Sequence, residues 1–412
     1  MGLRVAIVGG GIGGLALAQG LRRGGVDVKV FERDAGLAAR RQGYRIHLDG
    51  RAAKALHECL PPQLYELFRH TLATPGTALT VLDERLNVRH RGATGGGADP
   101  RVVEPAALSA PANRQTLREV LATGLEDTIA YGRSCIGYDE GPGGVRLHFA
   151  DGSRAEADVV VGADGVGSAV RRRRLPDARI VDTGARCVYG KTLLTPGTAL
   201  PEPVRAGFTA VVGGAGLGLA CALVRFPEPP DVAARRLCPA AAVSPVADYV
   251  MWAVTGPAAG FKAGDDELLG ADPGELHRLA AAAIGGWHPQ LRALVDGAEV
   301  DETFLVRVSI SEPAPAWAPG PVTVLGDAIH AMSPAGGSGA NTALMDAALL
   351  AGALIRADRG EEPLPAAVGA YEERMREYGY AAVAASTQNL GTMWARRHPV
   401  LARLAWLLGK GR

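Results

Sequence analysis

The chain has few cysteines, and their spacing carries no pattern. Five occur among 412 residues, at Cys59, Cys135, Cys187, Cys221 and Cys238, and no two of them form a CxxC pair. An odd, scattered set argues against a disulfide framework and against a zinc site, and it fits a reducing compartment. We therefore expect small buried side chains at these positions and no bound metal.

The chain also lacks an excess of charge of either sign and a long apolar run. Its net charge is +1, so no global field favours nucleic acid or an anionic membrane. The basic run at 171–174 has no interleaved aromatic residues, and we interpret it as a solvated helix face. No stretch approaches the roughly 20 apolar residues of a membrane helix, and the apolar N-terminus does not fit a signal peptide. We expect a cytoplasmic protein with no membrane span and no nucleic-acid partner.

The composition, 47% hydrophobic and 21% charged, is that of a globular protein whose length permits two or three domains. Residues 3–8 predict a buried strand, 12–24 a helix and 27–33 a second strand, which together open a parallel α/β sheet. From 185 to 255, β-like runs separated by prolines indicate a second, mostly antiparallel domain. Residues 364–408 are helical in pattern.

A glycine-rich loop follows the first predicted strand. It has a GxGxxG spacing and contains Gly9, Gly11, Ile12, Gly13 and Gly14. Such glycines permit a tight turn, close approach to a pyrophosphate and tight helix–strand packing, while the helix N-terminus stabilises the phosphate charge. Glu32 stands at the end of the next strand, placed for a ribose hydroxyl. At this point both NAD(P) and FAD remain possible.

Two later stretches repeat the form of a buried strand that runs into aspartate beside glycine. They are Asp164-Gly165, after 158–162, and Gly326-Asp327, after 321–325. Ligands of open α/β sheets gather at the carboxyl ends of the strands. Three such ends indicate one extended dinucleotide held along its length, which favours FAD.

With these three motifs in order across residues 5–345, the chain resembles the FAD-dependent aromatic hydroxylases, the single-component class A flavoprotein monooxygenases. This family includes para-hydroxybenzoate hydroxylase and the tetracycline-inactivating and polyketide hydroxylases. The second motif continues into Ser168 and Arg171, and the third into Pro334 and GGSGAN.

The resemblance implies an α/β fold: a Rossmann-like FAD-binding domain of the GR2 type, an inserted, mostly antiparallel β-sheet substrate domain, and C-terminal helices. On this basis we expect the FAD-binding domain at 1–75, 100–183 and 285–362. The substrate domain would take 76–99 and 184–284, and the C-terminal helical segment 363–412.

The resemblance also implies roles for individual residues. Glu32 would bind the adenosine ribose, with Arg33 beside it, and Arg114 would contact the ribityl or phosphate portion of the flavin. Asp164 and Gly165 would lie near the pyrophosphate and would also serve a transient nicotinamide cofactor.

In the third motif, Asp327 would bind the ribityl hydroxyls. Backbone N–H groups at the start of a helix would face the flavin pyrimidine, where the positive helix end stabilises an anionic reduced flavin. These groups belong to Gly339, Ala340 and Asn341, and the same loop includes Gly326, Pro334 and Gly337. Ser338 replaces a common glutamine, with little effect expected because backbone groups do the holding. We interpret His330 as a buried, hydrogen-bonded structural residue.

The family's reaction follows from its cofactor. NADPH or NADH reduces FAD, and the reduced flavin takes up O2 as a C4a-hydroperoxide that transfers one oxygen atom to an aromatic or polycyclic small molecule. Hydroxylation is the first expectation, with epoxidation or Baeyer–Villiger oxidation as variants, in a monomer or a homodimer. The protein supplies a dry, orienting pocket.

Other readings of the same fold remain open. The chain could be a flavoprotein that inserts no oxygen, either a reductase or dehydrogenase, or a non-redox cyclase that keeps FAD as a scaffold. A flavin halogenase would show a WxWxIP motif and a pocket lysine, and residues 249–257 do not fit it.

Catalytic and substrate residues are harder to assign, because the chemistry needs no fixed nucleophile. Arg45 replaces a usual glycine in the strand that relatives place under the flavin, and His47 is polar at a position facing the cavity, so both are catalytic candidates. Tyr189 and Lys191 alternate to one face of a strand in the substrate sheet. Met251 or Trp252 is expected to line the same pocket. The basic, amphipathic tail at 390–410 should pack on protein rather than on a membrane.

Overall fold

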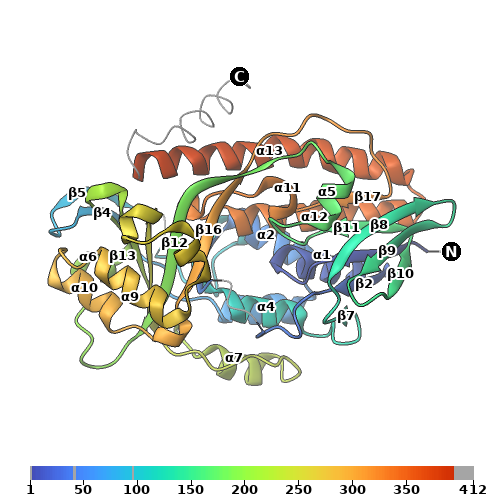
Figure 1. The fold of residues 1–412 in the computed structure, drawn as a ribbon. Helices are drawn as coiled ribbons and strands as arrows, with labels where there is room; N and C mark the ends of the chain where they lie inside the picture. The colour runs from blue at the N-terminus through green and yellow to red at the C-terminus, as the bar shows by residue number, and fades with distance from the viewer. Residues whose placement is uncertain (1, 40–42, 95–96, 394–412) are drawn as a thin grey trace.

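The structure is a computed structural model that describes residues 2–39, 43–94 and 97–393. Two β-rich lobes lie side by side, and the long helix α13 (Leu364–Met393) runs along both (Figure 1). One lobe contains a five-stranded parallel sheet in the order β17-β11-β1-β2-β7. Its strands are β1 (Arg4–Val8), β2 (Asp27–Phe31), β7 (Ile129–Ala130), β11 (Val159–Gly162) and β17 (Val322–Val324).

The parallel sheet forms because its central strands are short and apolar. Residues 159–162 of β11 are buried throughout, as expected of a parallel strand covered on both faces. One face of β1 and β2 is covered by helices, of which α1 (Ile12–Arg23) and α12 (Gly339–Asp358) contact each other. The other helices near this sheet are α2 (Gly50–Cys59), α3 (Pro62–His70), α4 (Arg114–Ala122), α5 (Ala169–Arg174) and α11 (Asp327–His330).

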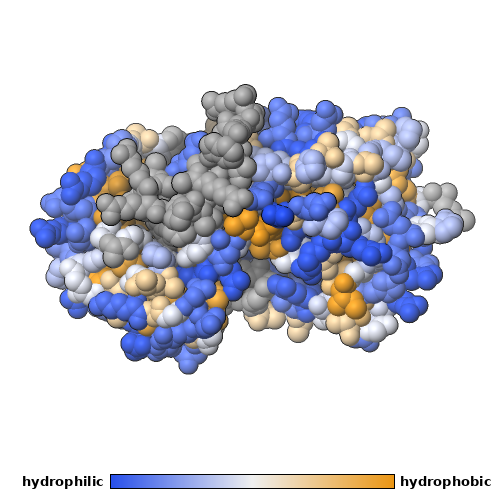
Figure 2. Space-filling view, turned by 45° about the horizontal axis from the view of Figure 1, so that its top comes forward, coloured by the Kyte–Doolittle hydropathy of each residue, from blue (hydrophilic) through white to orange (hydrophobic). Residues whose placement is uncertain are grey.

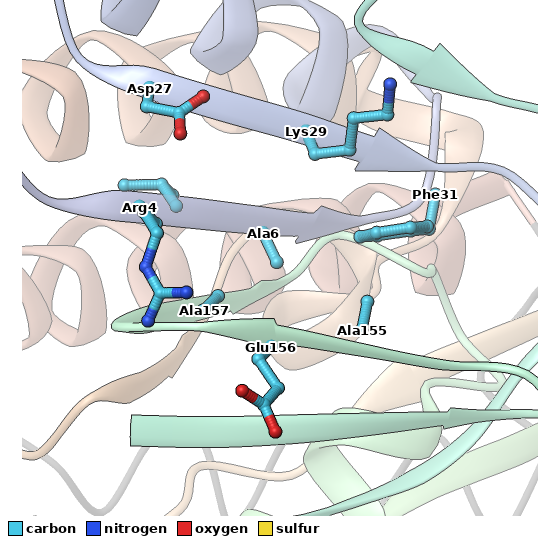
Figure 3. A pocket seen from close by; sticks show the side chains of 9 residues that line it. Arg4, Ala6, Asp27, Lys29, Phe31, Ala155, Glu156 and Ala157 are labelled. Carbon is cyan, nitrogen blue, oxygen red and sulfur yellow. The ribbon is translucent and has the colours of Figure 1, made fainter. Parts of the chain in front are cut away.

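A three-stranded antiparallel sheet covers the other face of the parallel sheet. It consists of β8 (Cys135–Gly141), β9 (Gly144–Phe149) and β10 (Arg154–Ala157). Phe149 packs on Phe31, with ring centroids 4.8 Å apart. Between the sheets a hollow of about 220 Å³ is lined by residues that include Arg4, Asp27 and Glu156 (Figure 3). Its lining runs along β2 from Asp27 to Phe31 and includes no residue of the three glycine loops.

The second lobe is built on a seven-stranded sheet in the order β16-β12-β15-β14-β13-β4-β5. Every pairing in it is antiparallel except that of β13 with β4. Its strands are β4 (Ala78–Asp83), β5 (Val88–Ala93), β12 (Ile180–Leu193), β13 (Gly207–Val212), β14 (Gly218–Val224), β15 (Tyr249–Pro257) and β16 (Phe304–Ser311). The expected mostly antiparallel second domain is therefore confirmed.

The two faces of this sheet differ. The back face packs in a dry cluster with Leu276, Leu291 and Leu294 of α9 and α10. The opposite face, which we call the front face, carries Tyr189, Lys191, Phe208, Ala220, Met251 and Phe304 and turns towards β3, Met332 and α13. The remaining elements are the β3–β6 pair (Arg45–Asp49 with Ser109–Asn113) and the helices α6 (Glu202–Ala206), α7 (Pro230–Leu237), α8 (Asp265–Gly270), α9 (Pro273–Ala283) and α10 (Pro289–Asp296).

The sheet memberships bear on the expected domain limits. β16 pairs with β12 over Phe304–Ser311, and α10 packs on the same sheet, so both belong with the second lobe rather than with a segment starting at 285. We therefore propose that the substrate domain extends to Ser311. Of the expected C-terminal segment, 364–393 is one helix, while 394–412, including most of the basic tail, lies outside the described residues.

Among the described helices, α12 alone has the length and composition of a membrane span, and half of its most apolar window is buried within the protein. It packs against α1, α2 and α13, so we assign it to the core. In space-filling view the surface is largely hydrophilic, with hydrophobic residues gathered near the middle of the face shown (Figure 2).

Candidate active site

The glycine loop at 9–14 is shaped by contacts that exclude side chains. Gly9 has φ +112°, and a Cβ added there would lie 2.3 Å from the Ala163 carbonyl oxygen. A Cβ on Gly14 would lie 2.1 Å from the Gly9 carbonyl oxygen. Gly11 is different, because a Cβ there would meet no atom within 4 Å. Two glycines therefore permit the turn and the helix packing, while Gly11 leaves open space in front of the N-terminus of α1.

Glu32 closes this loop from the end of β2. Its carboxylate accepts hydrogen bonds from the Gly10 N–H (2.6 Å) and the Asp34 N–H (2.9 Å). A carboxylate offers about four lone-pair sites, so two remain for the hydroxyls of a ribose. Arg33 is half exposed, with Nε 3.9 Å from an Asp34 carboxylate oxygen.

Arg118 supports the same loop, and the sequence patterns did not reveal it. It is 1% exposed on α4 and donates to the carbonyl oxygens of Gly10 (3.3 Å) and Leu37 (2.9 Å). Only its position four residues after Arg114, one turn along the same helix, could have suggested a role.

The loop after β11 is organised by Asp164. One carboxylate oxygen accepts from the Ala169 N–H at 2.7 Å and so caps α5, whereas Oδ1 is buried and has no hydrogen-bond partner among the described residues. Burial raises the pKa of Asp164, although its hydrogen bonds with Ser168 and backbone N–H groups act against this. The unpaired oxygen marks a position where a ligand donor would be stabilising.

Arg171 joins this loop to the next. It is buried, and Nη1 donates to the carbonyl oxygens of Val166 (2.9 Å) and Ala328 (3.0 Å). Arg174 likewise donates to the Val322 carbonyl oxygen at 3.1 Å. The interpretation of 171–174 as a solvated face was therefore wrong for Arg171, whose neighbours Arg172 and Arg173 are exposed. The run tightens the sheet edge rather than facing solvent as a whole.

The Gly326-Asp327 turn rests on a buried ion pair. His330 and Asp346 are both 0% exposed, and His330 Nε2 lies 2.6 Å from Asp346 Oδ2, which also accepts from the Gly326 N–H at 2.8 Å. Tyr378 donates to the other Asp346 oxygen at 2.5 Å. Burial alone would lower the pKa of His330, but the charge and hydrogen bond of Asp346 raise it. The expectation of a buried structural histidine is confirmed.

Asp327 is presented at the surface of this turn. Its side chain is exposed, yet desolvation raises its pKa, with His330 and Arg114 acting in the opposite direction. Solvent therefore reaches a carboxylate that is surrounded by protein. Arg114 begins α4, and its charge also acts on Tyr189, so it lies between the turn and the front face.

Asn341 has a clearer role than sequence suggested. Its side chain is 1% exposed, donates to the carbonyl oxygens of His47 (2.8 Å) and Gly337 (3.0 Å), and accepts from the Asp49 N–H at 2.9 Å. This amide holds β3 against the start of α12. Gly339 and Ala340 keep partly exposed backbones beside it, and Pro334 and Gly337 are exposed.

The front face supplies aromatic groups. Tyr189 stacks on Phe304 at 5.4 Å, and Tyr44 meets Phe304 edge-on at 5.4 Å. Tyr249 donates to the Tyr44 carbonyl oxygen at 3.1 Å and ties the sheet to β3. Lys191 is paired with Glu302 at 3.2 Å. Because Tyr189, Phe208 and Phe304 remain partly exposed between the lobes, this face can contact an apolar, planar ligand.

Trp252 lies on the wrong face for a substrate contact. In the β12–β15 register, Gly190 faces Trp252, while Lys191 faces Met251. Trp252 is 0% exposed in the back cluster, and a Cβ on Gly190 would lie 2.1 Å from its ring. The structure contradicts the expectation for Trp252, because the strand alternation turns it into the core, and it leaves Met251 on the front face.

His47 lies on β3, two residues after Arg45 and therefore on the same face of that strand. Its Nε2 is 3.4 Å from the Ser109 hydroxyl oxygen. Burial and the charge of Arg45 lower its pKa, against the effect of Asp49. The imidazole is therefore neutral at pH 7. In the described ranges, no three His, Cys, Asp or Glu side chains are arranged to hold a metal ion.

The chain is similar to known proteins. A family model described as "FAD binding domain" matches residues 308–386, and one described as "NAD(P)-binding Rossmann-like domain" matches 7–71. A 3-amino-4-hydroxybenzoate 2-monooxygenase of Streptomyces cremeus is 31% identical over 91% of this chain and 82% of its own length. The chain belongs to the FAD-dependent monooxygenase family.

Two further comparisons show how much of the chain resembles known proteins. A dual O-methyltransferase/FAD-dependent monooxygenase of Cercospora beticola is 37% identical over 90% of this chain, but the chain spans only 44% of that relative. A crystal structure described as an FAD-containing monooxygenase of Photorhabdus luminescens superposes with a TM-score of 0.79 at 29% identity, covering 95% of this chain and 98% of the other.

The residues present fit FAD, the cofactor of this monooxygenase family. Gly11 leaves room for a close approach, Asp164 Oδ1 has no donor among the residues that the structure describes, and Asp327 is accessible within the protein. All three lie at carboxyl ends of the parallel strands, where dinucleotides bind in this class of sheet.

Proposed function

We propose that this chain is an FAD-dependent, NAD(P)H-consuming monooxygenase that inserts one atom of O2 into an aromatic or polycyclic small molecule, with hydroxylation as the first expectation. One observation carries the proposal: three loops, one rich in glycine and two with glycine beside aspartate, meet at one end of the parallel sheet, and an aromatic sheet face stands across from them. Bound FAD would supply the electron transfer and the oxygen activation.

The chain's own residues would hold the cofactor at its two ends. Glu32 would accept the ribose hydroxyls, with Arg33 beside it, and the N–H groups opened by Gly11 would meet the pyrophosphate. Asp327 and Arg114 would take the ribityl hydroxyls and the phosphate. The start of α12, at Gly339 and Ala340, would offer N–H groups and a positive helix end to an anionic ring.

The substrate would lie on the front face. Tyr189 and Phe304 offer flat apolar surface, and burial raises the pKa of Tyr189 well above its usual value, so it stays neutral and can donate a hydrogen bond. Neutral His47 can accept a proton from a phenol, which would make the ring more nucleophilic. The Streptomyces cremeus relative, by its name, acts on a hydroxybenzoate, and an aromatic substrate of that kind fits these groups.

The setting of the reaction is also a proposal. Four of the five cysteines are buried and all are free, which suits a reducing, NAD(P)H-supplied cytoplasm. A monomer or a homodimer would serve equally, because the described residues of one chain supply every group named above.

Stopped-flow absorbance of the purified holoenzyme tests the proposal. The enzyme is mixed with NADPH or NADH in the presence of a panel of aromatic and polycyclic compounds. We expect at least one compound to accelerate flavin reduction and to be recovered with one added oxygen atom. Bound flavin that no compound makes reducible would favour a scaffold role instead, while reduction with no oxygenated product would favour a reductase.

A further inference from the structure

Arg45 reaches from one lobe to the other. It begins β3, which pairs with β6 in the FAD-binding lobe. Its guanidinium carbon lies 5.8 Å from the ring centroid of Phe208, on the front face of the seven-stranded sheet. The positive charge therefore stands between the lobes, beside the partly exposed aromatic rings.

Within the described part of the chain, Arg45 has no hydrogen-bond acceptor and no carboxylate partner. Its Nε is buried and unpaired, and burial lowers its pKa to about 10, with the tyrosine at 249 acting weakly against this. The nearby cation Lys191 is neutralised by Glu302 at 3.2 Å. Arg45 is thus a half-buried cation with an enclosed Nε, and among the described residues its guanidinium contacts the face of the Phe208 ring.

A guanidinium whose Nε is buried and unpaired carries a desolvation cost that a bound anion would offset. Five N–H donors in a planar fork match a carboxylate or a similar oxyanion. The ring of Phe208 can take one face of the guanidinium, which leaves its edge free for such a ligand. The pyrophosphate of a dinucleotide has its own place at the glycine loop after β1.

We propose that Arg45 binds an oxyanion on the aromatic substrate, a carboxylate or an ionised phenol, and that it makes this site selective for anionic aromatic compounds. The inference rests on the proposed function, because it assumes that the front face holds the substrate. Arg45 acts here in recognition, with no proton transfer assigned to it.

Binding of three matched probes to the holoenzyme tests this. 2-Naphthoate, 2-naphthamide and 2-naphthol share one ring system and differ in charge, and binding is followed by the change in flavin absorbance. We expect the wild type to bind 2-naphthoate about tenfold or more tightly than 2-naphthamide, the usual range for a charge-assisted hydrogen bond. Arg45→Gln should remove that preference, and Arg45→Lys should keep part of it.

The control is Arg307→Gln, which removes an exposed cation of β16 that is paired with Asp182, and it should leave the preference intact. FAD content and the melting temperature of each variant show that it is folded. The pH dependence separates the two anions. Binding of 2-naphthoate should be flat between pH 7 and 9, whereas 2-naphthol should bind more tightly over that range, because more of the phenol, with a pKa of about 10, ionises while Arg45 is still mostly charged.

Equal binding of acid and amide by the wild type, failure of both anionic probes to bind, or a preference that survives in folded Arg45→Gln would overturn the inference. The outcome is distinct from failure of the proposed function. An Arg45→Gln variant that reduces its flavin and oxygenates neutral compounds as the wild type does would support the monooxygenase function and contradict the role of Arg45. If binding depends on Arg45 but no compound makes the flavin reducible, the role of Arg45 is supported and the monooxygenase function is contradicted.

Discussion

The cofactor end of the parallel sheet and the front face of the seven-stranded sheet are built in different ways. At the cofactor end, loop groups are tied to one another: Glu32 holds the Gly10 N–H, Arg171 joins two loops, and Asp346 holds the Gly326 N–H. On the front face, Arg45 and the aromatic rings keep unused surface. The first region is held together by its own hydrogen bonds, whereas on our proposal the second is completed by its ligand.

The largest expected effect comes from filling the glycine turn. Gly9→Ala forces a Cβ to 2.3 Å from the Ala163 carbonyl oxygen at a φ that only glycine adopts readily. We expect a loss of about 3 kcal/mol of stability or more and protein purified without FAD. Urea denaturation and the flavin absorbance of the purified protein measure both. A variant of normal stability and normal FAD content would contradict the described turn.

Gly11→Ala is the matched variant. Nothing lies within 4 Å of the added Cβ, and φ is −77°, so the apoprotein should melt at the wild-type temperature. If the open space is where the pyrophosphate approaches, the affinity for FAD should fall about tenfold or more, as expected when a backbone contact is blocked. Titration of the apoprotein with FAD, followed by flavin fluorescence, measures this affinity. An unchanged affinity would indicate that the pyrophosphate does not approach Gly11.

The buried pair under the second glycine turn predicts a pH dependence. Asp346 raises the pKa of His330 above its unfolded value, about 6.5. The stability from this pair is therefore fully present below about pH 6.5 and is lost as the pH rises through the raised pKa. His330→Gln should cost about 1–3 kcal/mol at pH 6 and less at pH 9. Urea midpoints at the two pH values test this; a cost that grows with pH would be inconsistent with the pair.

The roles of the two faces of the seven-stranded sheet can be distinguished by one substitution on each face. Trp252→Phe shrinks a fully buried ring on the back face and should cost about 1–2 kcal/mol of stability without changing ligand binding. Phe208→Leu on the front face should weaken binding of aromatic ligands and leave FAD content unchanged. Melting curves and ligand titrations of both variants provide the check. Weaker ligand binding in Trp252→Phe would indicate that Trp252 contacts the ligand and would contradict its assignment to the back face.

The smallest effect concerns Arg45 without a ligand. If its charge is uncompensated, Arg45→Met should stabilise the ligand-free protein by about 1 kcal/mol, since an apolar side chain of similar length avoids the desolvation cost. Urea denaturation of the holoenzyme without ligand measures this. A loss of stability would show that Arg45 already has a partner.

The same contrast explains what could be predicted from the sequence. The glycine loops follow from motif spacing, because GxGxxG after a strand predicts a tight turn, although the atom that excludes a side chain at Gly9, the Ala163 carbonyl oxygen, lies in the distant loop after β11. The parallel sheet and the antiparallel second domain followed from patterns of apolar residues, and the burial of His330 from the way histidines are usually accommodated in protein cores.

The rest depends on partners far away in the chain. Trp252 and Met251 are neighbours in sequence, and only the register with β12 decides which of them faces the ligand. The sequence predicted that Arg171 is exposed to solvent, but in the fold it donates a hydrogen bond to the Ala328 carbonyl oxygen, 157 residues further along the chain. Whether Arg45 has a hydrogen-bond partner among the described residues depends on segments that are distant in sequence. The pattern of residues 43–50 therefore could not predict that its Nε is unpaired.

Incorporation of labelled oxygen tests the central claim most directly. The holoenzyme is supplied with NADPH, ¹⁸O₂ and the compound that most accelerates flavin reduction, and the product is analysed by mass spectrometry. The account predicts one ¹⁸O atom in each product molecule and the loss of this product in Gly11→Ala. NADPH consumption that yields only hydrogen peroxide with every compound tested, or a product whose added oxygen comes from water, would contradict it.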